Sequence, residues 1–175
     1  MKNNVQKLRS NYVNFMWLLS MTMVLLIVVP INVNAQKGKT DFAGTWVFNE
    51  SKSNLGDSGR RFGGGDMVAK QDANVLNVER TYTNRDGETN TMTSNYNLDG
   101  KESVNSFGRG ESKSTVKWSS DGKSITIVTK MSFNGNERTS TDVWTMKDAK
   151  TLSVESTRQG RDGEERKTTR IYDKK

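Results

Sequence analysis

The chain contains no histidine and no cysteine, so any chemistry must come from other side chains. Histidine is the usual general base near neutral pH, and cysteine thiolates serve as nucleophiles and as soft metal ligands. A Ser–Lys dyad or a pair of carboxylates is the remaining route to catalysis, but the carboxylates fall mostly in turn-like segments or on polar strand faces. We therefore expect no catalytic residue, no cofactor and no metal site.

Three arginines on otherwise apolar strand faces point to binding. Alternate side chains of an extended chain share a face, which places Arg80, Arg158 and Arg170 beside apolar or aromatic residues. These neighbours are Leu76, Val78 and Tyr82 for the first, Leu152 and Val154 for the second, and Tyr172 for the third. A charge facing a closed core is costly without a partner. Either the strands bend so that the arginines reach the rim, or the arginines line a wet cavity with acids or an anionic ligand.

The glycine-containing motifs are explained better as turns and loops than as sites. None of the Asp-Gly pairs continues as the alternating acids of a calcium loop, and Gly122-Lys123-Ser124 lacks the earlier glycine of a phosphate loop. The segment Gly59–Gly65 has the composition of an Arg–Gly tail, but it occurs once and suits a flexible loop. Basic residues elsewhere are interleaved with acids. We expect no nucleic-acid partner.

Regular turn signals divide the chain after residue 35 into short strands. Asp-Gly and Asn-Gly pairs accept the positive φ angles of tight hairpins. They are Asp86-Gly87, Asp99-Gly100, Asp121-Gly122, Asn134-Gly135 and Asp162-Gly163. With weaker turns at Gly108–Gly110 and Lys147–Lys150 they lie about 11–14 residues apart, too close for crossover helices, so sequence neighbours should pair antiparallel. The strands should begin near Thr45, Met67, Val75, Thr89, Glu102, Ser112, Ser124, Arg138, Thr151 and Glu165.

A closed barrel suits such a meander, because closure removes the two unpaired edges that an open sheet would expose. A two-sheet sandwich is the alternative, but it needs a long connection, for which Glu50–Asp66 is the candidate. We predict an all-β, antiparallel up-and-down β-barrel of about 8–10 strands. Hydrophobic residues make up only 32% of the chain. This fits a partly hollow, partly polar interior, although a Thr-rich outer face explains it equally simply.

Residues 1–35 have the order of a secretory signal peptide. Basic residues come first, an apolar run extends from Phe15 to Val29, and Val33-Asn34-Ala35 places small residues where a signal peptidase reads. An uncleaved anchor is the alternative, but the run of about 15 residues is shorter than the roughly 20 that span a bilayer. We expect cleavage near Ala35, a periplasmic or secreted location and one domain over residues 36–175. Cleavage removes three of 27 basic residues and none of 20 acidic ones, which lowers the net charge from +7 to +4.

Two motifs resemble one superfamily. The segment Asp41–Phe48, with Gly44-Thr45-Trp46, resembles the opening strand of lipocalins and fatty-acid-binding proteins. The segment Thr169–Lys174 resembles the closing strand of fatty-acid-binding proteins and the ends of small exported bacterial lipocalin-like proteins, which carry a Lys-Ser segment, here Lys52-Ser53. The resemblance implies a calycin barrel in which Trp46 closes one end and Gly44 lets another backbone or ring approach closely. It also implies a basic residue of the last strand over the Trp46 indole. Arg170 is the candidate for this residue, and Arg166 lies on the same strand face.

The resemblance also implies a place for a ligand. In fatty-acid-binding proteins the closing Arg-x-Tyr holds a carboxylate, and Arg170 and Tyr172 match it. Asp142 stands where those proteins have a helper arginine, so it either weakens anion capture or pairs with Arg170. Where those proteins have a two-helix lid, the segment Glu50–Asp66 contains Gly56, Gly59 and Gly63-Gly64-Gly65, a composition that favours a mobile loop over helices.

Two functional hypotheses follow. The first is an exported lipocalin-like protein that binds a small hydrophobic or amphipathic, lipid-like ligand as a monomer or weak oligomer. The expected lining is Tyr82, Met92, Tyr96, Met131 and Phe133, with Arg80, Arg158, Arg170 and Tyr172 as polar anchors. The alternative is a non-enzymatic protein-interaction barrel, of the envelope-stress or inhibitor type, that acts through its surface and the Gly-rich loop.

Overall fold

A computed structural model describes residues 38–56, 65–83, 87–107, 110–133, 135–160 and 163–175. The chain divides into two units between Asn34 and Ala35, and all described residues belong to the second. The predicted signal peptide and its cleavage near Ala35 lie outside the described residues and stay predictions. Within the described residues there is no helix both long enough and apolar enough to cross a membrane.

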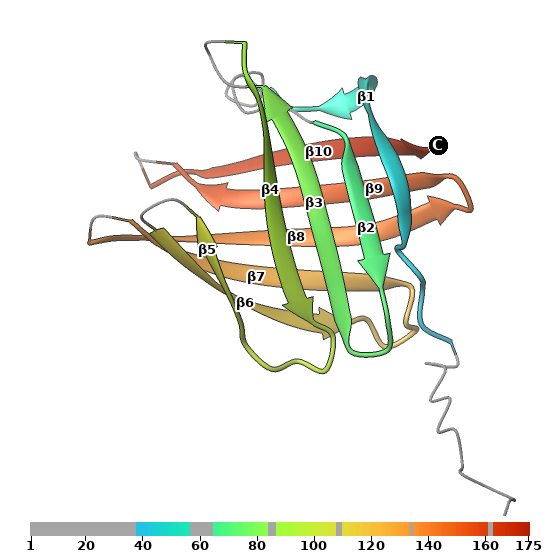
Figure 1. The fold of residues 1–175 in the computed structure, drawn as a ribbon, viewed down its shortest axis with the longest axis horizontal. Helices are drawn as coiled ribbons and strands as arrows, with labels where there is room; N and C mark the ends of the chain where they lie inside the picture. The colour runs from blue at the N-terminus through green and yellow to red at the C-terminus, as the bar shows by residue number, and fades with distance from the viewer. Residues whose placement is uncertain (1–37, 57–64, 84–86, 108–109, 134, 161–162) are drawn as a thin grey trace, which may run out of the picture. The chain divides into compact units, whose positions relative to one another are not determined.

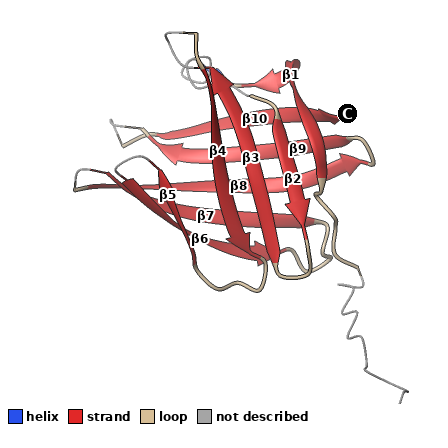
Figure 2. Ribbon diagram, in the orientation of Figure 1, coloured by secondary structure: helices blue, strands red, loops and turns tan. Residues whose placement is uncertain are grey.

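The described elements are ten antiparallel strands, each of which starts within two residues of its predicted start. They are β1 (Gly44–Asn54), β2 (Met67–Gln71), β3 (Val75–Thr83), β4 (Thr89–Asn97), β5 (Ser103–Phe107), β6 (Gly110–Trp118), β7 (Ser124–Phe133), β8 (Asn136–Asp148), β9 (Thr151–Gln159) and β10 (Glu165–Lys174). The prediction of an all-β meander is confirmed (Figure 2).

The strands form one sheet that nearly closes on itself. The order is β4-β3-β2-β1-β10-β9-β8-β7-β6-β5, so the first strand pairs with the last and each other neighbour is also a sequence neighbour. Strands β2–β4 cross in front of β7–β10 at a steep angle (Figure 1), which is how a twisted sheet folds back over its own core. The barrel prediction is confirmed, and the Greek-key sandwich is excluded because no strand skips a neighbour.

The two ends of the barrel differ. We call the end with the β2–β3, β4–β5, β6–β7 and β8–β9 turns the closed end, and the end where β3 passes to β4 and β9 to β10 the mouth. A buried apolar cluster of fifteen residues includes Phe42, Trp46, Ile125, Trp144 and Leu152, with Trp118 packed against it. Phe42 stacks on Trp118 and meets Trp144 edge-on, with ring centroids 6.0 and 5.9 Å apart. The closed end is therefore filled by side chains rather than hollow.

Trp46 is fully buried, and the cation over its ring is Lys174. The Lys174 Nζ atom lies 5.3 Å from the ring centroid, and the indole Nε1 donates to the Phe42 carbonyl at 3.0 Å. The expectation that Arg170 would cover Trp46 is wrong. Trp46 pairs with Lys174 in the ladder, so Arg170 lies four residues further along β10. A Cβ on Gly44 would come within 2.6 Å of Lys174 Cε, so glycine leaves the room that this lysine occupies.

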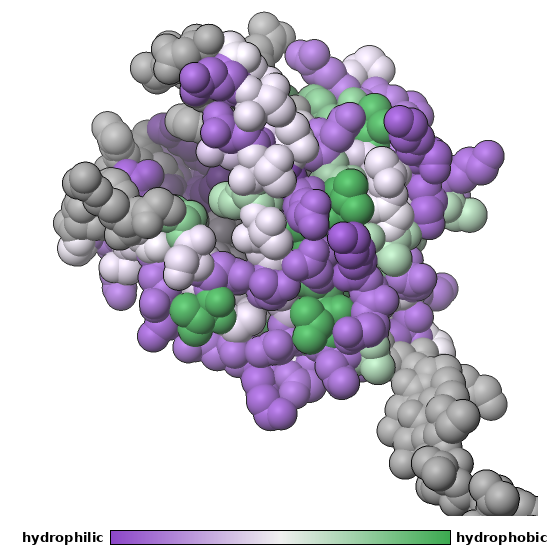
Figure 3. All heavy atoms as spheres, in the orientation of Figure 1, coloured by the Kyte–Doolittle hydropathy of each residue, from purple (hydrophilic) through white to green (hydrophobic). Residues whose placement is uncertain are grey.

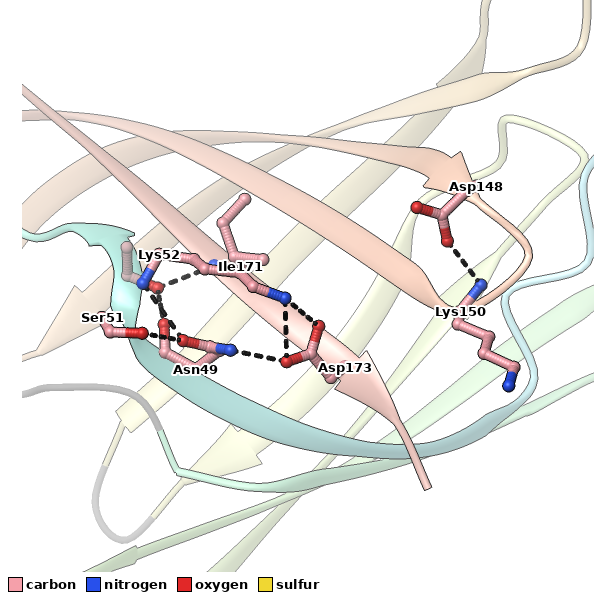
Figure 4. Close-up of polar contacts among 8 residues, drawn as sticks. Asn49, Ser51, Lys52, Asp148, Lys150, Ile171 and Asp173 are labelled. Atoms are coloured by element: carbon pink, nitrogen blue, oxygen red, sulfur yellow. Dashed lines mark hydrogen bonds and ion pairs between the residues drawn. The ribbon is translucent and has the colours of Figure 1, made fainter.

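Side chains on the outer surface connect a bulge in β1 to strand β10. Five steps along β1, from Asn49 to Asn54, oppose only two steps along β10. The Asn49 amide donates to Asp173, and Lys52 Nζ lies 3.0 Å from the Asp173 carboxylate (Figure 4). Ser53 Oγ donates to the Asn49 carbonyl and accepts from the Ile171 amide. The Lys52-Ser53 segment thus fastens the irregular part of β1 to the last strand.

The seam between β4 and β5 is joined by side chains instead of a ladder. The Asn105 amide group accepts from the Asn95 N–H at 2.7 Å and donates to the Asn95 carbonyl at 3.0 Å. The Asn97 amide donates to the Glu102 carbonyl at 3.0 Å. A carboxamide offers the same donor and acceptor as a peptide unit, so Asn105 substitutes for the strand residue that would otherwise pair with Asn95.

We predict that Asn105→Ala loosens this seam. Loss of two hydrogen bonds should lower the free energy of unfolding by about 1–2 kcal/mol. Urea unfolding measures this loss, and the Asn95 amide should exchange faster with deuterium. The neighbouring exposed Ser106 gives the control, since Ser106→Ala leaves the carboxamide bridge intact. Equal exchange rates in the two variants would contradict the role of Asn105.

Acidic residues fix the turns of the closed end and should make stability depend on pH. Hydrogen bonds hold the pKa values of four carboxyl groups below their ordinary value, mainly from backbone N–H groups or from Ser and Lys side chains. They belong to Asp72, Asp99, Asp121 and Asp148. A carboxylate whose pKa is lower in the folded state stabilises the fold above its unfolded-state pKa, and this contribution is lost as pH falls.

The melting temperature should therefore stay level from neutral pH down to about pH 5 and fall below about pH 4. Calorimetric scans across this range measure the effect. The matched control replaces all four aspartates by asparagine, whose amide oxygen still accepts from the turn N–H groups but does not titrate. A fall as steep in that variant as in the native protein would show that the turn carboxylates are not responsible.

Candidate ligand-binding site

The inward side chains change from apolar to polar along the barrel axis. Directly opposed residues of an antiparallel ladder share a face, so the register groups inward side chains into rows across the sheet. The row of Tyr172, Leu152 and Met146 lies nearest the closed end on β8–β10. The next row is Arg170, Val154, Trp144, Ile125 and Trp118, and it is followed by Thr168, Ser156, Asp142, Ile127 and Val116. The fourth row is polar throughout, with Arg166, Arg158, Ser140, Thr129, Ser114 and Ser103.

The inner face is open to solvent toward the mouth. Tyr82 and Met92 face inward on β3 and β4, yet they are 48% and 40% exposed. Arg158 is likewise exposed although it shares a row with the buried Ser140. Side chains that point into a barrel and still reach solvent show that the mouth half is not filled in the way the closed end is.

Arg80 occupies the centre of the polar cluster. Its guanidinium carbon lies 5.4 Å from the centroid of the Trp144 ring, and Tyr96 and Tyr172 lie close enough to shift its pKa. Burial alone would lower the pKa of Arg80, but Tyr96, Tyr172 and the Asp142 carboxylate outweigh burial and hold the pKa above its ordinary value. Arg80 is thus a fixed cation inside the barrel.

Arg170 reaches the same region from β10. Its Nη1 atom donates to Ser156 Oγ at 3.1 Å, and Ser156 Oγ in turn donates to the Asp142 carboxylate. Burial, reinforced by the neighbouring cations Arg158 and Arg80, lowers the pKa of Arg170 against the opposing effect of Tyr172 and Asp142. One carboxylate therefore serves at least two guanidinium groups, which leaves an excess of positive charge.

Two hydrogen-bond donors beside these arginines complete the cluster. Burial raises the pKa of Tyr172, although Arg80 and Arg170 oppose the shift, so its hydroxyl keeps its proton. The indole Nε1 of Trp144 is buried and has no hydrogen-bond partner among the described residues. Buried donors normally find an acceptor. Cations and protonated donors together suit an acceptor-rich group, such as a carboxylate, sulfonate or phosphate.

Eight of the nine predicted binding residues lie on inward-facing positions, but they do not form one group. The cluster contains Arg80, Tyr96, Arg170 and Tyr172, with Arg158 close enough to affect Arg170. Met92 is the direct cross-strand partner of Arg80, whereas Tyr82 and Met131 lie further toward the mouth by register. Phe133 ends β7, and its side chain lies outside the described residues.

The structure adds two residues that the sequence did not single out. Ser156 links Arg170 to Asp142 from the neighbouring strand, and Trp144 lies under Arg80. Ser156 follows Leu152 and Val154 at alternate positions, so its inward face was readable from the sequence. The link that Ser156 makes between Arg170 and Asp142 could not be predicted from the sequence, because this link depends on the β8–β9 and β9–β10 registers.

Among the comparisons with known proteins, only the one with solved structures found similar proteins, and it supports the fold alone. No protein-family model matches the chain, and no curated protein matches it. A mutant of the fluorescent protein UnaG is similar in structure with a TM-score of 0.50 and 20% identity, over 77% of this chain and 96% of that one. Wild-type UnaG gives a TM-score of 0.49 and 19% identity, over 77% and 97%. The barrel has a lipocalin-like fold. At this identity, a shared fold says nothing of the ligand.

We predict that Asp142→Asn destabilises the barrel and that an amphipathic anion restores its stability. Without this carboxylate, Arg80 and Arg170 keep their charge with less compensation, so the free energy of unfolding should fall by about 1–3 kcal/mol. Thermal shift with and without dodecanoate measures both effects. The exposed Glu155, on β9, provides the control for loss of a negative charge. An equal loss of stability in Glu155→Gln, or no larger shift by dodecanoate in Asp142→Asn than in the native protein, would contradict the prediction.

Proposed function

We propose that the protein is an exported, non-enzymatic carrier that binds a small amphipathic anion inside the barrel. The observation that carries this proposal is the inward cluster of Arg80, Arg170 and Tyr172 around the single Asp142 carboxylate. The acid group of the ligand would take the place beside these donors, and its apolar part would extend toward Met92 and Met131.

Electrostatics favour an anion over a neutral ligand. Enclosed cations attract an anion more strongly than cations in water do, because the surrounding dielectric is lower. The network already contains the Asp142 carboxylate, which accepts from Ser156 and lies near the arginines, and this supports a carboxylate as the kind of group that these side chains bind. The closed end supplies apolar surface from Trp144 and Val154 directly below.

The export of the chain rests on the order of residues 1–35. The protein-interaction alternative places its contact in Gly56–Gly65, of which residues 57–64 lie outside the described residues. The polar interior favours the carrier over that alternative, since a barrel acting only through its surface has no use for buried cations.

We expect Arg170→Gln to weaken ligand binding about 10- to 100-fold, the equivalent of about 1.5–3 kcal/mol for a hydrogen bond to a charged group. Anilinonaphthalene sulfonate is a suitable probe, because its fluorescence reports binding to the native protein and its displacement by dodecanoate reports competition.

Lys167→Gln is the control, because Lys167 lies on the outward face of the same strand and carries the same charge. Native mass spectrometry of the purified protein should also detect a retained small molecule. The carrier function is refuted if neither anion binds, or if Arg170→Gln and Lys167→Gln bind the probe equally well.

A further inference from the structure

The two edge strands of the sheet differ in length. Strand β4 has nine residues (Thr89–Asn97), whereas β5 has five (Ser103–Phe107). Among the described residues, the hydrogen bonds across the seam involve only Asn95 and Asn97 of β4, both near its C-terminal end. Figure 1 shows β4 extending past the end of β5, which leans away from it. Within the described part of the sheet, the first half of β4 is therefore an edge with no neighbouring strand on that side.

Three threonines present their backbone groups at this edge. Alternate residues of an antiparallel strand direct both N–H and C=O to the same side. Asn95 directs both groups toward β5, because its N–H and its carbonyl bind the Asn105 side chain. The β3–β4 ladder runs through β4 without a bulge, so the residues at every second position before Asn95 have the same orientation. These residues are Thr93, Thr91 and Thr89.

Strand β4 has none of the usual features that prevent an edge from pairing. Natural edge strands are commonly short, bulged or interrupted by proline, or they carry charged side chains, especially lysine. The nine residues of β4, TNTMTSNYN, include no proline and no charged residue. The side chains of the three threonines lie on the outer face and are exposed. An uncharged, regular and exposed edge of this kind is a template for another strand.

The same three threonines make the edge complementary to itself. In an antiparallel pair of copies related by a twofold axis at Thr91, Thr91 faces its own counterpart and Thr89 faces Thr93 of the second copy. Each facing pair exchanges two backbone hydrogen bonds, which gives about six in total. Threonine faces threonine in every pair, a combination that also forms side-chain hydrogen bonds, and no like charges are opposed. An axis at Thr93 would instead use Asn95, whose backbone groups are already bound to Asn105.

We infer that the protein pairs with a second copy of itself through the first half of β4, in an antiparallel register centred on Thr91. The pairing joins β3 and β4 of each copy into one continuous sheet. A second copy fits better than an unrelated peptide, because the twofold register satisfies the free backbone groups of Thr89, Thr91 and Thr93 with the same three residues. The inference is independent of what the barrel binds.

Sedimentation velocity of the purified native protein tests this pairing. The range should extend from about 10 µM to about 1 mM, since a small interface gives weak association. The native protein should shift from monomer to dimer as its concentration rises. Thr91→Lys should weaken dimerisation more than about tenfold, because it opposes two like charges at the axis. Circular dichroism should show that this exposed substitution leaves the fold intact.

Thr141→Lys is the matched control for the added charge. Thr141 occupies an outward position in the middle of β8, where it has ladder partners on both β7 and β9. This variant should therefore dimerise as the native protein does.

Single cysteines test the register, because the chain has no cysteine of its own. Hydrogen-bonded partners in an antiparallel ladder have Cα atoms about 5.5 Å apart, a distance that a disulfide spans. Thr91→Cys should therefore crosslink to a second copy under mild oxidation. Thr89→Cys should crosslink when it is mixed with Thr93→Cys but not by itself, because its own counterpart lies four residues away, or roughly 13 Å along the strand.

Three results would overturn the inference. The first is a native protein that stays monomeric over the whole concentration range, including one whose β4 edge binds a different peptide instead. The second is a dimer that Thr91→Lys and Thr141→Lys affect equally, since its interface would then lie elsewhere. The third is a dimer in which Thr89→Cys crosslinks by itself while Thr91→Cys does not, which would require a different register.

Discussion

Pairing of the first strand with the last is the constraint on which the rest of the structure depends. Once β1 is paired with β10, every strand except the two at the β4–β5 seam has a neighbour on both sides, and each strand has one face turned inward. Each inward side chain must then be packed against others, hydrogen-bonded or exposed to water. The chain meets this demand with aromatic and aliphatic residues at one end and with arginine, serine and aspartate at the other. The apolar and the polar inward side chains thereby lie in different halves of one wall.

The polar half is organised around an excess of cations rather than around ion pairs. Asp142 interacts with Arg80 and Arg170 and receives a hydrogen bond from Ser156. Within the described part of the cluster, one carboxylate lies between two guanidinium groups. Under the proposed function, this arrangement would hold the arginines in position for a further anion, as a preorganised site does.

Much of the fold could be predicted because period-two alternation and Asp-Gly turns are local signals. They gave the strand starts and the inward phase of Arg80, Arg158 and Arg170 directly. Properties set by distant pairing could not be predicted in the same way. The cation over Trp46 is Lys174 rather than Arg170 because of the β1–β10 register. The bulge after Asn49, where this register shifts, has no repeating pattern in the sequence from which it could be predicted. The bridge through Ser156 depends on two further registers, those of β9 with β8 and β10.

The seam between β4 and β5 has a mechanical consequence for the wall as a whole. A backbone ladder keeps its two strands at a fixed spacing, whereas a seam joined through the Asn105 and Asn97 side chains can widen by rotation about their χ angles. The circumference of the barrel can therefore change at one line without the loss of any strand pair elsewhere. The face drawn in Figure 3 is mostly hydrophilic with scattered apolar groups, and Val104, which precedes Asn105 on β5, is 54% exposed.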